Sequence, residues 1–386
     1  MLQVGRPARE WMTPFNVVAG LIVLVGLYFI VVRFSQGLAS ITDASDDQPW
    51  GLLLSWGLFA GVPLSASGFA LGTAVYLFGM KEYHPVVRNA ILIGFLGYFF
   101  AVVFLLIDLG RPWRIYYPMF VSFGPASVMF LVAWHVALYL SCQALEFSPA
   151  ALEWLKLKIL RRWALALTIG LTIFGVILST LHQSALGAMF LLAPGKLHPL
   201  WYTPYLPWLF FLSSIAGGLS MVIFVGMLTQ RFLKRHADAP YLASLEPISL
   251  GLGSAASITL FSYFALKVIA LAHGDHWQLL STPWGYWYLV ELLGFVLLPC
   301  FLFAYASSRN NVTLVRFTAI WTIGGIILNR FNVSLIAFNW SLPDRQLFHW
   351  KELVIILSVV TIQILTYRWI ASRMPVLRED QQYQSE

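Results

Sequence analysis

The residues best placed for chemistry lie at positions 181–218, where two long apolar segments meet. The triplet His182-Gln183-Ser184 closes the first segment, and an aromatic–proline run at 201–208 opens the second. A neutral imidazole can exchange a hydrogen bond with a quinone carbonyl, and its pKa suits proton transfer when the quinone is reduced. Tryptophan and tyrosine rings concentrate at headgroup depth. We therefore expect the floor of a docking surface and one wall of a small-molecule pocket here.

Ionisable side chains inside apolar segments are costly to bury, so they are candidates for function. For His182 the alternative is a structural histidine that hydrogen-bonds a loop carbonyl, and the residues alone leave both roles open. Arg330 lies deep in its segment and needs a carboxylate, backbone carbonyls or a ligand. Lys267 and Glu291 lie near segment ends, where a snorkelling lysine and a cross-helix pair explain them.

Four further positions near segment ends or among small residues could contact a ligand. Asp108 and Arg111 are one turn apart, which allows an ion pair that holds a proton acceptor or, as we favour, clamps a loop. The buried hydroxyl of Tyr98 needs a partner on a ligand or a neighbouring helix. Trp113 is expected in the aromatic belt.

Metal and haem chemistry are not expected in this chain. A b-type haem needs two histidines at matched depth, and His135 lies roughly ten residues, about 15 Å, inside its segment while His182 ends its own. The two cysteines, Cys142 and Cys300, fall in different apolar segments, too few for an iron–sulfur cluster. Adjacent Asp275-His276 is too weak a pattern to predict a metal site.

The composition predicts an all-α polytopic membrane protein. Of 386 residues, 59% are hydrophobic and 11% charged, against about 25% charged in soluble domains. The net charge of +7 resides in short loops between apolar segments, so no nucleic-acid partner is expected. We expect one integral membrane domain over residues 1–386 with helices near 14–34, 52–80, 89–108, 125–147, 163–183, 205–230, 248–272, 286–307, 313–337 and 351–374.

The arrangement of these helices follows from their order and charges. Segments two to five and six to nine are expected to form two four-helix bundles, each flanked by one extra helix, with a kink near Pro63 in the second segment. Residues 148–162, beginning with Ser148-Pro149, are expected to lie flat on the membrane surface. Basic residues predict that this surface and both termini are cytoplasmic: Arg6, Arg9, Lys81, Arg88, Lys156, Lys158, Arg161, Arg162, Arg231, Lys234, Arg235, Arg309, Arg368, Arg373 and Arg378.

Several short stretches, in this order and spacing, resemble the NrfD/polysulfide-reductase membrane-subunit family, and within it the HybB-like ten-helix branch. That branch includes the membrane subunit of hydrogenase-2 type enzymes and of sister periplasmic redox complexes. The matching stretches cover most of the chain: Pro49–Gly51, Tyr83–Arg88, Gly97-Tyr98, Asp108–Arg111, Ala144–Phe147, Leu181–Ser184, Leu197–Trp201, Asn332–Ser334 and Ala337–Asn339.

The resemblance implies a haem-free subunit of a bacterial inner-membrane complex that binds menaquinone or ubiquinone near the outer face. It also implies a periplasmic, ferredoxin-like iron–sulfur partner and further redox subunits of a hydrogenase, multihaem-cytochrome or sulfur-metabolism complex. We expect His182 to carry protons, with Asp108 as its proton partner. The expected ligand contacts are His182, Gln183, Tyr98, Arg111, Trp113, Glu146, His135, Arg330 and Asn332.

Three alternatives compete with this interpretation. The chain could be an anchor without quinone chemistry, or a proton-translocating subunit. Against proton translocation, Gly57 and Leu131 stand where the resembling branch carries acids on its second and fourth segments. A secondary transporter would have broken helices and a midplane polar site, whereas the polar residues here cluster toward the outer face.

Overall fold

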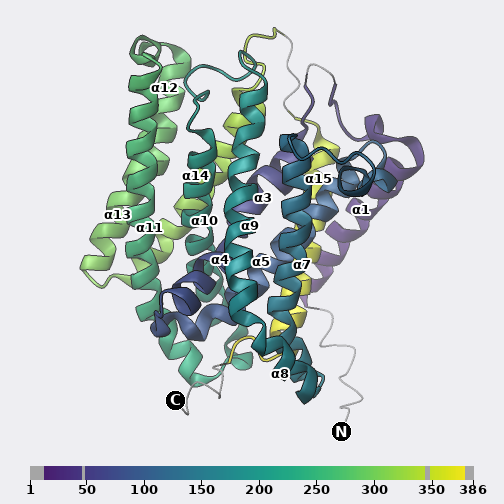
Figure 1. Ribbon diagram of the computed structural model, residues 1–386, viewed down its shortest axis with the longest axis vertical. Helices are drawn as coiled ribbons and strands as arrows, with labels where there is room; N and C mark the ends of the chain where they lie inside the picture. Colours follow the sequence, from purple (N-terminus) through teal and green to yellow (C-terminus); the bar gives the residue numbers. More distant parts are fainter. Residues whose placement is uncertain (1–12, 46–47, 344–347, 379–386) are drawn as a thin grey trace.

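The computed structural model describes residues 13–45, 48–343 and 348–378, and this part of the chain is almost entirely helical (Figure 1). It contains 10 helical spans long and apolar enough to cross a membrane, which confirms the predicted fold class. Arg6 and Arg9, two of the basic residues used to predict the cytoplasmic face, lie outside the described residues. The spans are Pro14–Gln36, Leu52–Leu77, Lys81–Asp108, Val128–Trp154, Thr168–Leu192, Leu206–His236, Ala239–His273, Pro283–Ser308, Val312–Ile336 and Trp350–Arg373.

Two groups of four spans pack side by side. The first contains the second span with α5 (His84–Asp108), α7 (Val128–Trp154) and α9 (Thr168–Ala188). The second contains α10 (Leu206–Leu228), α11 (Ala239–His273), α12 (Pro283–Leu289) with α13 (Leu298–Ser308), and α14 (Val312–Phe331). The groups meet where α10 packs against α9 and the second span.

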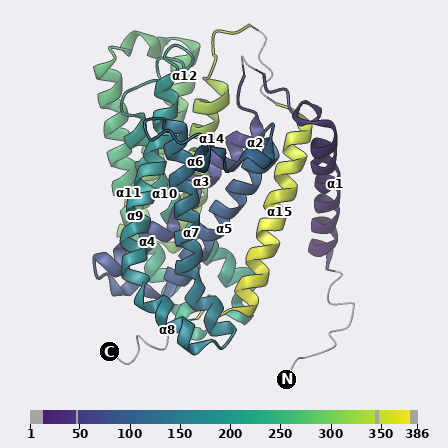
Figure 2. The same ribbon diagram turned by 45° about the vertical axis from the view of Figure 1, so that its right-hand side comes forward.

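The two remaining helices pair with each other instead of flanking one bundle each. Helix α1 (Pro14–Gln36) packs along α15 (Trp350–Arg373), and α15 contacts α5 of the first bundle (Figure 2). A Cβ added at Gly26 would lie 2.0 Å from the Cβ of Ser358, so only glycine permits this approach. Small residues at the contact let helix backbones pack closely in a membrane, where water does not drive association.

The second span is broken rather than merely kinked at Pro63. It consists of α2 (Leu52–Leu54), the π-helix Ser55–Ala60, α3 (Gly61–Leu64), α4 (Ser67–Gly72) and the π-helix Thr73–Leu77. The break falls at Ser65-Ala66, just after the proline, whose ring removes a helical hydrogen bond. Glycines of two neighbouring helices pack closely against the break. A Cβ added at Gly97 of α5 would overlap the Ser65 hydroxyl, and a Cβ added at Gly218 of α10 would overlap the Ala66 backbone.

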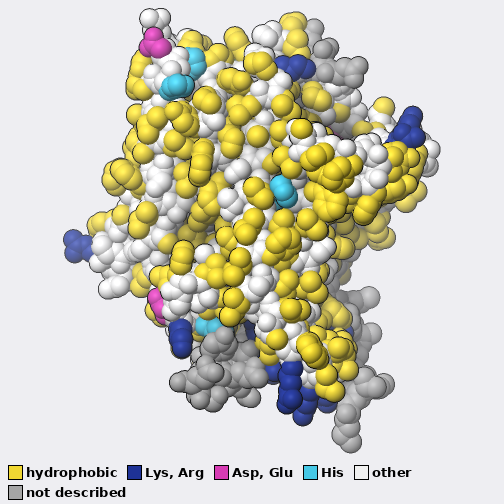
Figure 3. Space-filling view, viewed as in Figure 1, with side chains coloured by type: hydrophobic (Ala, Val, Ile, Leu, Met, Phe, Trp, Pro, Cys, Tyr) yellow, Lys and Arg dark blue, Asp and Glu magenta, His cyan; other side chains and the backbone are white. Residues whose placement is uncertain are grey.

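We call the two ends of the molecule the α8 face and the α12 face. The predicted flat helix is present, but Ser148-Pro149 does not begin it. Helix α7 continues through Pro149 to Trp154, and α8 (Lys158–Ala166) then turns across the end of the bundle. The described ends of α1 and α15, at Pro14 and Arg373, lie at this same face (Figure 2). Lysine and arginine side chains gather there in the view of Figure 3, while the sides between the ends are mainly hydrophobic.

At the α12 face, the loop at 193–205 is held against the link between α14 and α15. Leu197 and Phe338 form an antiparallel bridge, and the backbone amide of Asn339 donates to the carbonyl of Lys196 at 2.6 Å. The predicted docking floor is therefore only partly exposed: Trp201 is 0% exposed, whereas Trp208 is 62% exposed. Trp201 instead donates through Nε1 to Glu291 at 2.8 Å, which fixes the loop to the second bundle.

Candidate functional site

Helices α5, α7 and α9 bring His182 together with aromatic and amide side chains in the first bundle. His182 is fully buried, and its Nδ1 lies 2.7 Å from the carbonyl of Leu178. A carbonyl can only accept, so Nδ1 carries the proton and Nε2 accepts from the Tyr98 hydroxyl at 2.5 Å. The amide of Gln183 donates to the same hydroxyl at 3.1 Å and to the carbonyl of Val62 at 3.3 Å. The predicted contacts His182, Gln183 and Tyr98 thus form one hydrogen-bonded group.

A polar row continues from this group toward the α8 face. The ring of Tyr139 packs against both Tyr98 and His182, with centroids 4.6 and 5.2 Å away. Its hydroxyl accepts from the amide of Gln143 at 2.6 Å. One turn further along α7, the Glu146 carboxylate accepts from the hydroxyl of Thr172 at 3.2 Å. Glu146 therefore belongs to the far end of this row and not to the contacts of His182.

Several buried polar side-chain atoms on α7 and α9 have no hydrogen-bond partner among the described residues. They are Trp134 Nε1, His135 Nδ1, Gln143 Oε1, Ser179 Oγ and Gln183 Oε1. His135 lies one turn from Tyr139 on α7, on the side toward the α12 face. Unpaired buried donors and acceptors are costly, so they indicate a missing polar partner. A quinone, whose two carbonyl oxygens accept and whose reduced hydroxyls donate, fits this set of atoms.

Access to His182 itself is closed in this structure. Both of its ring nitrogens are engaged, and Tyr98 and Tyr139 cover the ring. A ligand oxygen can reach Nε2 only after the Tyr98 hydroxyl turns away. The unpaired atoms of Trp134 and His135 are, in contrast, available without breaking a hydrogen bond.

The predicted pair of Asp108 and Arg111 does not form among the described residues. Arg111 and Trp113 are exposed, the latter by 69%, on the loop that follows α5. Arg33 of α1 takes the place expected of Arg111: its guanidinium donates to the backbone carbonyls of Ile107 and Leu109 at the end of α5. Nothing in the sequence connects the first helix with this end of α5, because the contact joins segments that are far apart in the chain.

Arg330 and Asn332 lie in the second bundle, apart from His182. Arg330 is 1% exposed and donates to Asn329 at 2.8 Å and to Ser213 at 2.6 Å, with its guanidinium over the ring of Phe210. Glu291 accepts from Asn329 and from Asn332, and the buried Lys267 lies 5.1 Å from the ring of Tyr288. These partners explain the burial of Arg330 and Asn332 as structural, because the network lies at the base of the 193–205 loop.

His182 and His135 do not lie at the different depths that the sequence predicts. Helix α9 continues past His182 to Ala188, so His182 and His135 both lie well inside their helices and near the same level. A bound haem still does not fit these residues, because both nitrogens of His182 are engaged and two tyrosine rings occupy the space beside it.

Comparison with known proteins shows the family of this membrane fold. The profile of the family described as "Polysulphide reductase, NrfD" matches residues 40–338. This chain belongs to the NrfD polysulphide reductase family. The NrfD match spans both four-helix groups, from the loop before the second span to the end of the ninth.

Three NrfD-type relatives align along nearly the whole chain. A protein of Nitratidesulfovibrio vulgaris (strain Hildenborough), named only "Protein", is 47% identical over 99% of both chains. "Probable Ni/Fe-hydrogenase 2 b-type cytochrome subunit" of Escherichia coli (strain K12) is 30% identical over 93% of this chain and 91% of its own. "Menaquinone reductase, integral membrane subunit" of N. vulgaris is 26% identical over 89% of this chain and 88% of its own.

Sequence reasoning missed three members of the buried group: Tyr139, Gln143 and Ser179. The sequence contains a signal for these residues: polar or aromatic side chains recur at helical spacing on α7, at positions 135, 139, 143 and 146. Nothing in the sequence showed that this stripe faces His182 and not lipid.

Proposed function

We propose that this NrfD-family subunit of a respiratory redox complex binds a quinone near the α12 face and passes electrons between it and a partner subunit. The observation that supports this most directly is the buried His182–Tyr98–Gln183 group with unpaired polar atoms on the neighbouring turn of α7. The name of the menaquinone reductase relative favours menaquinone. This chain has too few cysteines to hold an iron–sulfur cluster. The proposed electron partner would therefore carry the cluster.

The chain's residues would bind and orient the ring and supply protons. When bound, the quinone supplies the redox chemistry, taking up two electrons and two protons. Trp134 and His135 have the unpaired ring nitrogens to fix one carbonyl oxygen. The Tyr98 hydroxyl, held between His182 and Gln183, would turn to the ligand and donate its proton, with His182 as the next group in line. Asp108, nearly three turns further along α5, remains the predicted proton partner at the α12 face.

Replacement of His182 by glutamine tests this function. Loss of the imidazole leaves Tyr98 without its acceptor, so we expect quinone-dependent turnover of the purified complex to fall at least tenfold. Subunit composition should not change, because His182 is buried and away from any docking surface. His276→Gln is the matched control: it lies at the same face outside the group and should keep full turnover.

Normal turnover in His182→Gln would contradict the proposal and favour a membrane anchor without quinone chemistry. The visible absorption spectrum of the purified chain is a separate check. We expect no haem bands, and bands that vanish in both His135→Ala and His182→Ala would refute the quinone assignment.

A second candidate function, proton conduction, is supported by the polar row that links His182 to Glu146. Glu146 lines a cavity of about 830 Å³ that opens at the α8 face. Gly57, one of the two positions where the resembling branch carries an acid, does not interrupt this row, because it packs against Phe104 away from it. By the positive-inside rule the α8 face is cytoplasmic in the bacterial inner membrane, so protons would enter from the cytoplasm and reach the quinone near the periplasm.

Glu146→Gln distinguishes the two candidates. If protons reach the quinone through Glu146, the variant should lose most quinone-linked turnover and all proton uptake in liposomes. Glu153→Gln, at the same face but outside the row, is the control. Unchanged turnover and proton uptake in Glu146→Gln would exclude this route while leaving quinone binding intact.

A further inference from the structure

The cavity of about 830 Å³ at the α8 face has a strongly basic entrance. Lys81, Arg88 and Arg162 line it together with His84, from the start of the third span and from α8. Among the described residues that line it, Glu146 is the acidic one, about two turns inside the end of α7. The entrance therefore carries an excess of positive charge, and the single carboxylate lies at the inner end.

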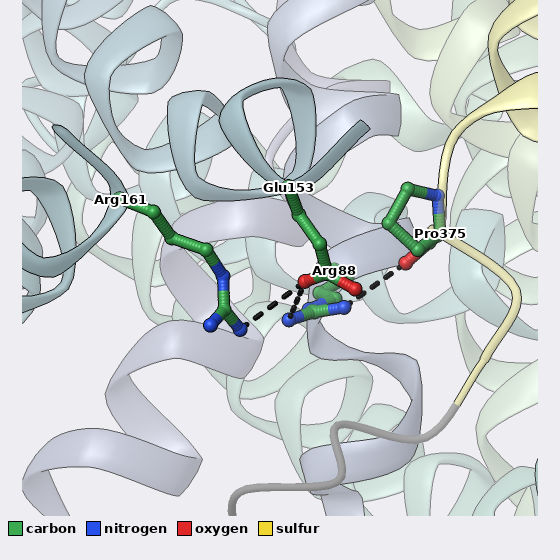
Figure 4. Close-up of polar contacts among 4 residues, drawn as sticks. All are labelled: Arg88, Glu153, Arg161 and Pro375. Atoms are coloured by element: carbon green, nitrogen blue, oxygen red, sulfur yellow. Dashed lines mark hydrogen bonds and ion pairs between the residues drawn. The ribbon is translucent and has the colours of Figure 1, made fainter. Parts of the chain in front are cut away.

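A fixed network holds one of these cations in place. Figure 4 shows Glu153 between Arg88 and Arg161, each with a guanidinium nitrogen 3.1 Å from the carboxylate. Arg88 also donates through Nη1 to the carbonyl of Pro375 at 3.1 Å. These contacts tie α5, α7 and α8 to the end of the chain after α15. They hold Arg88 at the cavity wall before any ligand arrives, which lowers the entropic cost of binding.

The inner walls and the surroundings of the cavity are apolar. Val75, Val87, Ile91 and Phe147 line its interior. Ile169, which also lines the cavity, is 59% exposed, and Phe78, next to the lining residue Gly79, is 75% exposed; both would face lipid.

Helix α8 adds Ile159 and Trp163, which are 74% and 70% exposed, beside its arginines. A basic amphipathic helix of this kind lies at the boundary between headgroups and acyl chains. The entrance is thus at headgroup depth, with basic side chains above apolar ones.

We propose that this cavity binds the phosphate of an anionic phospholipid, with the glycerol and upper acyl chains against its apolar walls. Lys81 and Arg162 at the entrance and Arg88 on the wall contact the phosphate oxygens, since arginine and lysine are the side chains that recognise phosphate. The lipid would fasten α8 to the first bundle at the face opposite the quinone site. This binding does not depend on the proposed quinone chemistry.

Native mass spectrometry of the full-length chain in mild detergent, titrated with dioleoyl phosphatidylglycerol, tests the proposal. We expect a retained lipid adduct, and binding that is on the order of tenfold to thirtyfold weaker in the double variant Lys81→Gln/Arg162→Gln, from about 1 kcal/mol per basic residue. Both positions are exposed, so the variant should fold. Lys158→Gln/Arg235→Gln is the matched control: it removes the same two charges from the same face but outside the cavity, and should bind as the unmodified chain does.

Two further titrations separate the sources of phosphate and the effect of general charge. Phosphatidylcholine should bind much more weakly, and millimolar inorganic phosphate should not displace the lipid. Displacement by inorganic phosphate, with no lipid retained, would show that a soluble phosphate and not a lipid is recognised, and would overturn the lipid assignment. Equal weakening in both double variants, or equal binding of the two lipids, would overturn the site itself.

Discussion

At the scale of single residues, burial and hydrogen bonding decide which candidates are chemically available. His182 was selected because it is a histidine at the edge of an apolar segment, and the structure gives it a defined tautomer through Leu178 and Tyr98. Arg330 is a candidate because it lies deep in its apolar segment, yet neighbouring side chains and a carbonyl satisfy most of its donors. The difference lies in the surroundings, since both residues are fully buried and ionisable.

His198 offers a pH-dependent prediction outside the membrane spans. It is 3% exposed in the loop at the α12 face, and its Nδ1 accepts from the amide of Leu200. Burial, reinforced by the nearby His276, lowers the pKa of His198 from 6.5 to about 4. The unfolded chain therefore takes up a proton near pH 6.5 while the folded chain does not. This contribution to stability is fully present above pH 6.5 and is lost as the pH falls from 6.5 to 4.

We expect the thermal unfolding temperature in detergent to fall more steeply between pH 7 and pH 5 in the unmodified chain than in His198→Gln. His236→Gln, an exposed histidine at the other face, should behave as the unmodified chain does. Parallel pH profiles for the unmodified chain and His198→Gln would contradict a buried neutral imidazole.

At the scale of elements, the broken second span is the feature that one helix of each bundle accommodates, α5 of the first and α10 of the second. The helix is interrupted just after Pro63, and the turn at Ser65-Ala66, whose amides donate to carbonyls at 61–63, fits against the glycines of α5 and α10. Broken helices often hold ions in transporters. Here the break is filled by close backbone packing, and the amide of Gln183 donates to the carbonyl of Val62 just before it. The break thus supports the position of Gln183 beside Tyr98.

Gly218→Ala tests this packing. Its Cβ would lie 2.6 Å from the backbone carbonyl carbon of Ala66, which cannot move as a flexible side chain would. We expect a loss of about 1–3 kcal/mol in unfolding free energy from overpacking. Gly324→Ala in α14 is the control, because nothing lies within 4 Å of its added Cβ. It should be neutral or stabilising by up to about 1 kcal/mol. Equal stability of the two variants in a detergent unfolding assay would refute the close approach.

At the scale of the whole molecule, two four-helix groups share one interface and the α1–α15 pair covers the first group on its outer side. The candidate quinone site, the polar row and the basic cavity all belong to the first group. The second group instead carries the Glu291 and Arg330 network that anchors the 193–205 loop. Under the proposed function, the first group would perform the chemistry and the second would support the face on which a partner docks.

Gly26→Leu tests whether α1 is structurally separate from the site. A Cβ at this position would overlap Ser358 of α15, so we expect α1 to dock poorly and become sensitive to protease. Quinone-dependent turnover should change less than twofold, because α1 reaches the first bundle chiefly through Arg33 at the end of α5. Gly20→Leu on the same helix is the control: a Cβ added at Gly20 meets no described atom within 4 Å, so this variant should remain resistant to protease. Loss of turnover in Gly26→Leu alone would show that the pair supports the site.

The sequence by itself determined the membrane class and the ten spans, and it singled out the His182 triplet as a candidate site. Hydrocarbon imposes a fixed length of apolar residues on every span, and burying a charge there is costly enough to stand out. It did not determine which polar residues meet, because helices that pack together can be far apart in the chain. Packing decided three of these placements: Arg33 and not Arg111 lies at the end of α5, Glu146 lies at the far end of the polar row, and Arg330 lies in the other bundle. The broken span is also an outcome of packing: proline predicts a kink, but only the glycines of two neighbouring helices make room for a full break.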